Sequence, residues 1–496
     1  MSRERPADGQ ATETGPPPDV PVRESGSSSV RTATTPRLTS ARIRLITAGV
    51  ITTNFLVALE ATVVSTAAPT IVGELGGMGL YAWVFTAYML TTTVTGPLWG
   101  KLSDLYGRKP MYLASVAIFL AGSALSGQSR SMTELIAFRA LQGIGGGALI
   151  PLGQTVLAEV YDLASRARIQ ALITTIFGIA SIVGPLVGGI ITQHASWRWI
   201  FYLNVPFGLA GVLILALTLP PHRARGPVHF DWAGTGVFSR ALTRFLVWTQ
   251  GLPGWSLHDP RAWGGLLAIV ILAACFWKIE QAHPDPLLPP GLFRIRMFMA
   301  GSVVMTLVGM TLFGAITYLP LFYQSVLHDS ASQAGQALTP LLVTWIMGST
   351  LSTRMILKAG YRITLAVGLL GFLAAFAIMA AAGAETPRWV LAAAGVFAGV
   401  GGGFTVAPLV IAVQSVVDRP HLGIATSEVL FFRSVGASVG VTLMGVALNA
   451  ASRSDLALGL QRAFQVGMFF AVLSVAAWWL VPPGSAESFQ AKEPGQ

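Results

Sequence analysis

Apolar runs separated by short polar connections follow one another along nearly the whole chain. Most of these runs have roughly 18–25 residues, and a helix of about 20 residues crosses a hydrocarbon layer of ~30 Å. The pattern therefore predicts an all-α polytopic membrane protein with about 14 transmembrane helices. The predicted runs are Leu45–Ala68, Tyr81–Gly100, Met111–Gly127, Thr133–Leu157, Ile169–Thr192, Ile200–Leu219, Ala233–Gly251, Trp263–Ile279, Phe298–Tyr323, Ala337–Ile356, Ile363–Ala382, Val390–Val413, Gly423–Asn449 and Phe464–Val481.

The charge content agrees with a membrane environment. Hydrophobic residues make up 53% of the 496 residues and charged residues 11%, against about 25% charged residues in soluble domains. The formal net charge of +10 comes from Lys and Arg scattered between the apolar runs, which fits membrane orientation better than nucleic-acid binding. If the amino terminus is cytoplasmic, basic residues of the inner connections outnumber those of the outer ones by about two to one. This predicts a multi-pass protein of the inner (cytoplasmic) membrane with both termini inside.

The two ends of the chain differ from the rest. Residues 1–40 are rich in Pro, Gly, Ser, Thr and Arg without apolar periodicity, which predicts a disordered cytoplasmic tail. They lack the apolar core and cleavage site of a signal peptide. Cys275 is the one cysteine of the chain, so an internal disulfide is excluded.

A distinctive motif, Gly100-Lys-Leu-Ser-Asp-Leu-Tyr-Gly-Arg-Lys, connects the second and third runs. Its glycines permit a tight turn, and Asp104 and Arg108 are within ion-pair reach if the segment is helical. A basic loop that only fixes topology is the simpler interpretation. The spacing, however, closely resembles the signature loop of the major facilitator superfamily, whose charge network stabilises one access state. The resemblance implies a gating loop made of Gly100, Asp104, Gly107 and Arg108.

The fourth run contains Arg139-Ala-Leu-Gln-Gly-Ile-Gly-Gly-Gly147. An arginine inside a membrane helix costs about 2.5 kcal/mol or more and normally faces a polar partner, although it could also extend to the outer surface. The glycines permit close helix packing. The segment resembles the second motif of the same superfamily.

The fifth run contains a glycine-rich motif with an internal proline. Packing of small residues alone would explain the glycines, but a proline also kinks a helix. The complete pattern resembles the motif of facilitator antiporters. The resemblance implies an antiporter packing motif made of Gly178, Gly184, Pro185, Gly188 and Gly189.

Segments around Glu60, Ser196–Pro206 and Tyr318–Gln324 resemble the fourteen-span drug:proton antiporter (multidrug efflux) branch of the superfamily. The likeness extends from about Arg42 to Val481, but that branch usually has aspartate at the position of Glu60. The resemblance implies the major facilitator fold, with two six-helix bundles and two extra central helices. The expected parts are a tail (1–40), an N-terminal bundle (41–220), two linker helices (221–296), a C-terminal bundle (297–482) and a short C-terminal tail (483–496).

Glu60 and Arg139 are the candidates for proton coupling. Glu60 lies roughly 22 Å from the inner edge of its run and Arg139 roughly 9 Å from the outer edge of its own, so their depths in a ~30 Å core are similar. Burial raises a carboxyl pKa and a nearby arginine lowers it, so a pKa between those of the two compartments is attainable. A permanent ion pair of purely structural value is the alternative.

Further polar and aromatic positions are candidates for a substrate cavity. They are Phe55, Gln142, Tyr318, Tyr323, Gln324, Phe404, Glu428 and Arg433. Arg240 and Arg244 lie on one face of the seventh run, where the sequence does not separate contact with anionic lipid or substrate from an unspecific interface.

The expected function is export of drugs or other small amphipathic molecules in exchange for protons. The sequence has no phosphate loop for ATP, no Cys/His cluster for a metal and no nucleophile motif, so an enzyme is not expected. The energy source would be the proton gradient, without a cofactor. The expected partners are a small-molecule substrate, protons and lipid, without nucleic acid or an obligate protein. The alternatives are a dedicated exporter of a native metabolite, lipid or peptide, and a non-transporting sensor or scaffold.

Overall fold

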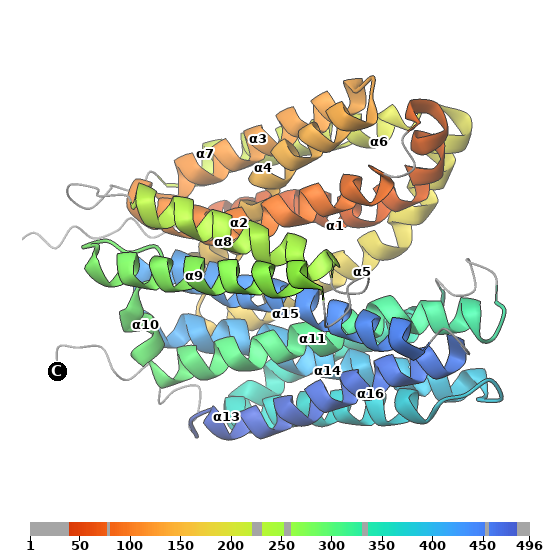
Figure 1. Cartoon of the computed structure of the whole chain (residues 1–496). Helices are drawn as coiled ribbons and strands as arrows, with labels where there is room; N and C mark the ends of the chain where they lie inside the picture. The colour runs from red at the N-terminus through yellow and green to blue at the C-terminus, as the bar shows by residue number, and fades with distance from the viewer. Residues whose placement is uncertain are drawn as a thin grey trace, which may run out of the picture. The chain divides into compact units, whose positions relative to one another are not determined.

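A computed structural model describes residues 39–76, 80–220, 231–251, 259–329, 336–451 and 456–483. The predicted tails (1–40 and 483–496) lie almost wholly outside the described residues, as do Arg223 and Arg225, which belong to the connection after the sixth predicted run. Regular secondary structure in the described ranges is entirely helical (Figure 1). The α-helices are α1 (Ser40–Leu75), α2 (Tyr81–Tyr106), α3 (Arg108–Gln128), α4 (Met132–Val160), α5 (Leu163–His194), α6 (Arg198–Tyr202), α7 (Asn204–Thr218), α8 (Trp232–Gly251), α9 (Pro260–Ala282), α10 (Pro290–Arg294), α11 (Arg296–Ser325), α13 (Thr339–Ala381), α14 (Arg388–Val416), α15 (Leu422–Ala451) and α16 (Leu456–Ala477), with 3₁₀ turns at Arg419–His421 and Trp478–Leu480.

The helices carry the predicted apolar runs. Within the described ranges, ten helical stretches are long and apolar enough to cross a membrane, so the prediction of an all-α, multi-pass protein is confirmed. The α2, α5 and α8 helices are not among the ten, and the count of fourteen spans therefore stays a prediction. The tenth and eleventh runs both fall on α13, where helical geometry is interrupted at Gly360.

Two glycines let the chain reverse between successive helices. Gly107 separates α2 from α3 with φ 98°, and Gly360 interrupts α13 with φ 77°. A side chain in this left-handed region is strained, so glycine is the residue that suits each turn. The positive φ of Gly107 explains why a glycine stands at this turn of the motif.

Helices α1 to α7 pack on one another as an N-terminal group. The glycine run of α4 lies between α2 and α3, close enough for its backbone to contact theirs. A Cβ atom on Gly143 would lie 2.1 Å from Thr91 Oγ1, and one on Gly145 would lie 2.3 Å from the backbone nitrogen of Phe119. The interpretation of these glycines as close-packing residues is confirmed.

Helices α11 and α13 to α16 form a C-terminal group around one apolar core. This core contains many fully buried aromatic side chains, which supply large apolar areas. Examples are Phe298, Phe322, Phe372, Phe376 and Phe464. The domain boundaries expected from the sequence stay predictions.

The two groups meet along two seams. In the first seam, α5 packs on α13, where Thr174 and Ser349 share a hydrogen bond of 3.2 Å. Gly178 lies in this seam, because a Cβ atom there would be 2.3 Å from Ile346 Cδ1. Gly184 and Gly188 are buried, a Cβ on Gly189 would meet open space, and α5 continues through Pro185 without interruption.

The second seam lies between α2 and α15. Helices α8 and α9 pack together as a linker hairpin and contact this seam (Figure 1). Their apolar cluster includes Val94 of α2, Phe238 of α8 and Phe276 of α9. The ring of Phe238 packs at a tilt against that of Phe431 of α15, with centroids 5.5 Å apart. The linker hairpin therefore packs against both groups at once. Arg240 and Arg244 are exposed on α8 and point away from this contact.

Candidate functional site

Glu60 and Arg139 form a buried ion pair inside the N-terminal group. Each side chain is about 2% or less exposed, and Arg139 Nη1 contacts Glu60 Oε1. The second carboxylate oxygen, Oε2, accepts a hydrogen bond of 2.7 Å from Asn204 Nδ2. Both oxygens of Glu60 therefore have a donor, which is the requirement for burying an ionised carboxylate.

The remaining surroundings of Arg139 fix its orientation. Its Nη1 also donates to Gln142 Oε1 at 2.7 Å, and its Nε donates to the backbone oxygen of Val84 at 3.2 Å. The guanidinium carbon lies 4.3 Å from the ring centroid of Tyr88, which adds a cation–π contact. Thus α1, α2, α4 and α7 all contribute to one network around a single titratable carboxyl.

Sequence reasoning placed Glu60 and Arg139 at similar depth, and the structure brings them into contact. It missed Asn204, Tyr88 and Ser123, which complete the network. Asn204 also donates to Ser123 Oγ at 2.9 Å, and this hydroxyl donates to the backbone oxygen of Phe201. An asparagine buried at the start of an apolar helix was the available signal, but its partners come from helices distant in sequence.

The gating-loop residues form a second charged cluster at the junction of α2 and α3. Arg108 pairs with Asp104, donates to Glu159 Oε1 at 2.9 Å and donates to Ser103 Oγ at 2.9 Å. Arg108 therefore links α3 to α2 and to α4.

Asp104 reaches across the second seam. Its carboxylate accepts hydrogen bonds from the backbone nitrogens of Gly423 at 3.2 Å and Ile424 at 2.8 Å, in the first turn of α15. A carboxylate at a helix N-terminus satisfies free N–H groups and complements the positive end of the helix dipole. A side chain of the N-terminal group thus caps a helix of the C-terminal group.

Glycines permit this approach. A Cβ atom on Gly100 would lie 2.4 Å from Ser427 Oγ, and one on Gly423 would lie 2.7 Å from Asp104 Oδ1. The resemblance-based assignment of Gly100 to the gating loop therefore corresponds to a site where α2 and α15 nearly touch. We call Gly100, Asp104, Arg108 and Gly423 the seam clamp.

The structure does not gather the candidate cavity residues at one place. Gln142 belongs to the Arg139 network, whereas Tyr318 donates to the backbone oxygen of Val441 at 2.6 Å. Tyr323 donates to the backbone oxygen of Arg388, and Gln324 is exposed. Of the others, Phe55 is partly buried on α1, and Phe404 is buried against α13. On α15, the side chain of Arg433 is partly exposed and that of Glu428 is fully buried.

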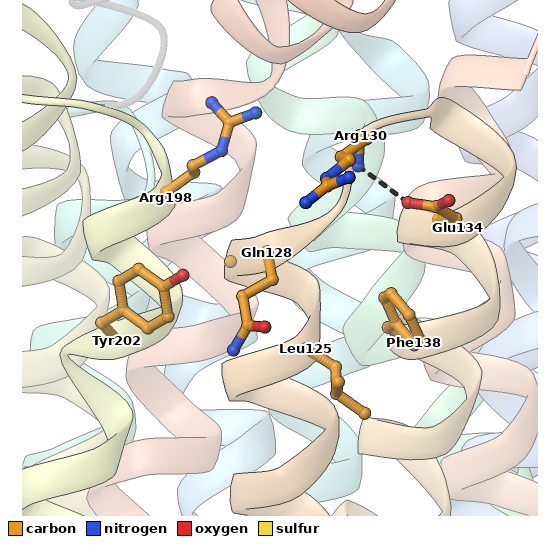
Figure 2. Close-up of a pocket in the computed structure, with 8 residues that line it drawn as sticks. Leu125, Gln128, Arg130, Glu134, Phe138, Arg198 and Tyr202 are labelled. Atoms are coloured by element: carbon orange, nitrogen blue, oxygen red, sulfur yellow. Dashed lines mark hydrogen bonds between the residues drawn. The ribbon is translucent and has the colours of Figure 1, made fainter.

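Two described cavities lie at helix ends. The larger, of about 440 Å³, opens between the ends of α3, α4 and α6 (Figure 2). Arg130, Glu134 and Tyr202 line it, and the backbone nitrogen of Arg130 donates to Glu134 Oε2 at 2.8 Å. The second, of about 320 Å³, includes Tyr323 beside the Asp329–Arg388 ion pair. Tyr323 is the one candidate cavity residue that lines either of these two spaces.

Glu74 anchors the far end of α1 to the residues that start α6. It accepts hydrogen bonds from Arg198 Nη1 and from Trp197 Nε1, the latter at 2.6 Å. The Arg198 hydrogen bond, followed by that of Trp197, lowers the pKa of Glu74 below its usual value of 4.5. The ionised form is therefore the form that stabilises the fold.

A pH-dependent stability difference follows for Glu74→Gln. A lowered pKa stabilises the fold above the unfolded value of 4.5 and ceases to do so as pH falls through the folded pKa. Because Glu74 is half exposed, the substitution should cost less than about 1 kcal/mol near neutral pH. Thermal unfolding of the purified protein should show a difference near neutral pH that disappears as the pH falls below the folded pKa of Glu74. A difference that grows on acidification would contradict this interpretation.

Comparison with known proteins covers most of the chain. The family model of the Major Facilitator Superfamily matches residues 50–441 and 302–495. The multidrug transporter protein MdtP of Bacillus subtilis is 36% identical over 83% of this chain and 76% of its own length. Multidrug resistance protein 3 of the same organism is 31% identical over 82% of this chain and 79% of its own.

A solved structure supports the fold. The human organic anion transporter MFSD10 (TETRAN) superposes with a TM-score of 0.66 at 16% identity, covering 88% of this chain and 99% of that one. At this identity the likeness concerns the fold alone. Together with the family match, it shows that this all-helical, multi-pass chain belongs to the Major Facilitator Superfamily and is a membrane transporter, not an enzyme.

Proposed function

We propose that this transporter exports drugs or other small amphipathic molecules across the cytoplasmic membrane in exchange for protons, as a member of the fourteen-span drug:proton antiporter branch. The observation that carries the proposal is the buried Glu60–Arg139–Asn204 network. Intramembrane ionisable residues are costly and are usually retained for function. The names of the Bacillus relatives support drugs as the substrate class.

Glu60 would carry the proton. In its ionised form it satisfies Arg139 Nη1 and Asn204 Nδ2. Protonation removes the negative charge and leaves the Arg139 guanidinium with Gln142, Val84 and the Tyr88 ring as its contacts. The two protonation states therefore favour different arrangements of α1 and α4, and this difference can couple proton binding to a change of access.

The seam clamp would control which side is open. Asp104 holds the first turn of α15 and thereby keeps the α2–α15 seam closed at this end. The excess of basic residues in the expected inner connections supports assigning this end, and both termini, to the cytoplasmic side by the positive-inside rule. Breaking the clamp would open the transporter toward the cytoplasm. This assignment agrees with the role that the superfamily resemblance implies for the loop.

Inside-out vesicles with an imposed pH gradient test the proposal. Wild-type protein should accumulate a cationic amphipathic dye when the vesicle interior is acidic, and Glu60→Gln should lose this gradient-driven uptake. Glu385→Gln, which changes an exposed carboxylate in the connection before α14, is the matched control and should keep uptake. Gradient-driven uptake by Glu60→Gln at the wild-type rate would exclude Glu60 as the proton carrier.

A panel of competing compounds separates the two substrate hypotheses. Competition by many unrelated amphipaths would indicate a multidrug exporter. Uptake that one compound class alone inhibits would indicate a dedicated exporter of a native metabolite, lipid or peptide.

A further inference from the structure

Three buried carboxyl groups and one ammonium group gather where the linker hairpin covers the α2–α15 seam. They are Lys101 on α2, Asp231 at the N-terminus of α8, Glu280 on α9 and Glu428 on α15, which we call the seam cluster. Each is 7% exposed or less. None of them belongs to the Glu60 network or the seam clamp.

Close approaches and electrostatic interactions indicate that these side chains lie near one another. A Cβ atom on Gly234 would lie 2.1 Å from Asp231 Oδ2 and 3.0 Å from Glu280 Oε1, so both carboxylates border that glycine. Among the described residues, the charged groups that act electrostatically on Glu428 are Glu280 of α9 and Lys101 and Asp104 of α2. Lys101 also acts on Glu280. Full ionisation would leave an excess of negative charge in a buried space, which is costly.

Hydrogen bonding identifies the carboxyl that must be neutral. Glu280 accepts bonds from the backbone nitrogens of Leu287 at 3.2 Å and Leu288 at 2.7 Å, and Asp231 accepts one from Gly234 at 2.7 Å. Glu428 is fully buried, and neither of its oxygens has a hydrogen-bond partner within the part of the chain that the structure describes. An ionised carboxylate without donors is the least stable species in such a site.

The position of Glu428 connects it to the seam. It lies six residues after Leu422 in α15, or about 9 Å along the helix. The preceding residue, Ser427, is the one that nearly touches Gly100 of α2. Separation of α15 from α2 would therefore admit water to Glu428, whereas closure removes it from water.

We propose that Glu428 is a second proton-binding site, which must hold a proton for the α2–α15 seam to close and which releases it to the cytoplasm when the seam opens. The step breaks the O–H bond of the carboxyl and transfers the proton to water, leaving a hydrated carboxylate near Lys101. The proposal rests on the alternating access of the proposed function but not on Glu60. It makes closure of the cytoplasmic side sensitive to cytoplasmic pH.

Asp104 of the seam clamp and Glu428 should change the opening of the seam in opposite directions as pH rises. Ionised Asp104 caps α15 and favours closure, so the titration of Asp104 would close the seam as pH rises. Ionisation of Glu428 would open it. An opening at high pH therefore cannot come from Asp104.

The test measures the seam directly in the full-length protein in lipid nanodiscs. Spin labels are placed at Tyr106→Cys and His421→Cys, two exposed positions on opposite sides of the seam, with the exposed Cys275 replaced by serine. Electron paramagnetic resonance then follows the distance between the labels as pH is raised, without substrate. Wild type should shift from the short to the long distance, and Glu428→Gln should keep the short distance over the same range.

Two further variants complete the test. Lys101→Gln removes the cation that favours ionised Glu428, so its opening should need a higher pH than that of wild type. Glu385→Gln should behave as wild type. The proposal is overturned if Glu428→Gln opens at the same pH as wild type, or if that variant is unfolded and Lys101→Gln leaves the opening pH unchanged.

The same labels in a Glu60→Gln background separate this proposal from the proposed function. Opening at the wild-type pH in that background shows a seam site independent of Glu60. Loss of the opening there would overturn the second site, whatever the dye-transport result with Glu60→Gln.

Discussion

Replacement of Arg139 by leucine should lower the free energy of unfolding by about 3–5 kcal/mol, because it leaves Glu60 buried without its cation. Asn204 would remain as a donor to one carboxylate oxygen, but a single neutral donor does not balance a buried charge. Chemical unfolding of the purified protein in detergent measures the loss. Arg130→Leu changes an exposed arginine in the connection before α4, outside the network, and should cost less than about 1 kcal/mol.

The double variant Glu60→Leu/Arg139→Leu distinguishes the pair from its surroundings. Removing both charges should restore a large part of the stability lost in Arg139→Leu, since no unpaired charge remains. Equal losses in the single and double variants would mean that the other contacts of Arg139, not its pairing with Glu60, account for the cost. The double variant should nevertheless fail in proton-driven transport.

Asp104→Asn should shift the equilibrium between closed and open seams toward the open form. The carboxylate supplies two charged hydrogen bonds to the first turn of α15 and pairs with Arg108. Loss of charged hydrogen bonds worth about 1.5–3 kcal/mol corresponds to a roughly 10- to 150-fold change in the equilibrium. The labels at positions 106 and 421 described above would report this as a larger open fraction at every pH.

Asp418→Asn is the matched control, since Asp418 is an exposed aspartate near the same end of α15. It should leave the open fraction unchanged. An Asp104→Asn protein with the wild-type open fraction would show that the cap on α15 does not hold the seam closed.

The sequence predicted most of the fold because apolar length and turn glycines are local signals. Gly107 lies at a turn, as its motif permits, and the apolar runs fall on helices. Depth along two helices was also enough to place Glu60 near Arg139. What connects helices across space was not predictable in the same way: Asn204 lies 144 residues from Glu60, and Asp104 caps a helix 320 residues later.

The residues of a substrate cavity were also not predictable from the sequence. Aromatic and polar residues in membrane helices serve equally well in packing, in backbone hydrogen bonds or in a cavity. Tyr318 makes a backbone hydrogen bond to α15, and Gln324 faces outward. The sequence made Glu428 a candidate for the substrate cavity, but only its lack of partners among the described residues and its neighbours Lys101 and Glu280 give it a defined chemistry.

The backbone contacts around Gly143 and Gly145 have a kinetic consequence. At these points α4 lies against the backbone of Tyr88 in α2 and of Phe119 in α3, so a displacement of one helix is transmitted to the other two with little loss. Helices α2, α3 and α4 should move as one rigid body, and the contacts that break during each transport cycle would be those of the seams. The transport rate would then depend exponentially on the free energy of the contacts in the seams, about tenfold for every 1.4 kcal/mol. Substitution of a few seam residues should therefore change the transport rate most.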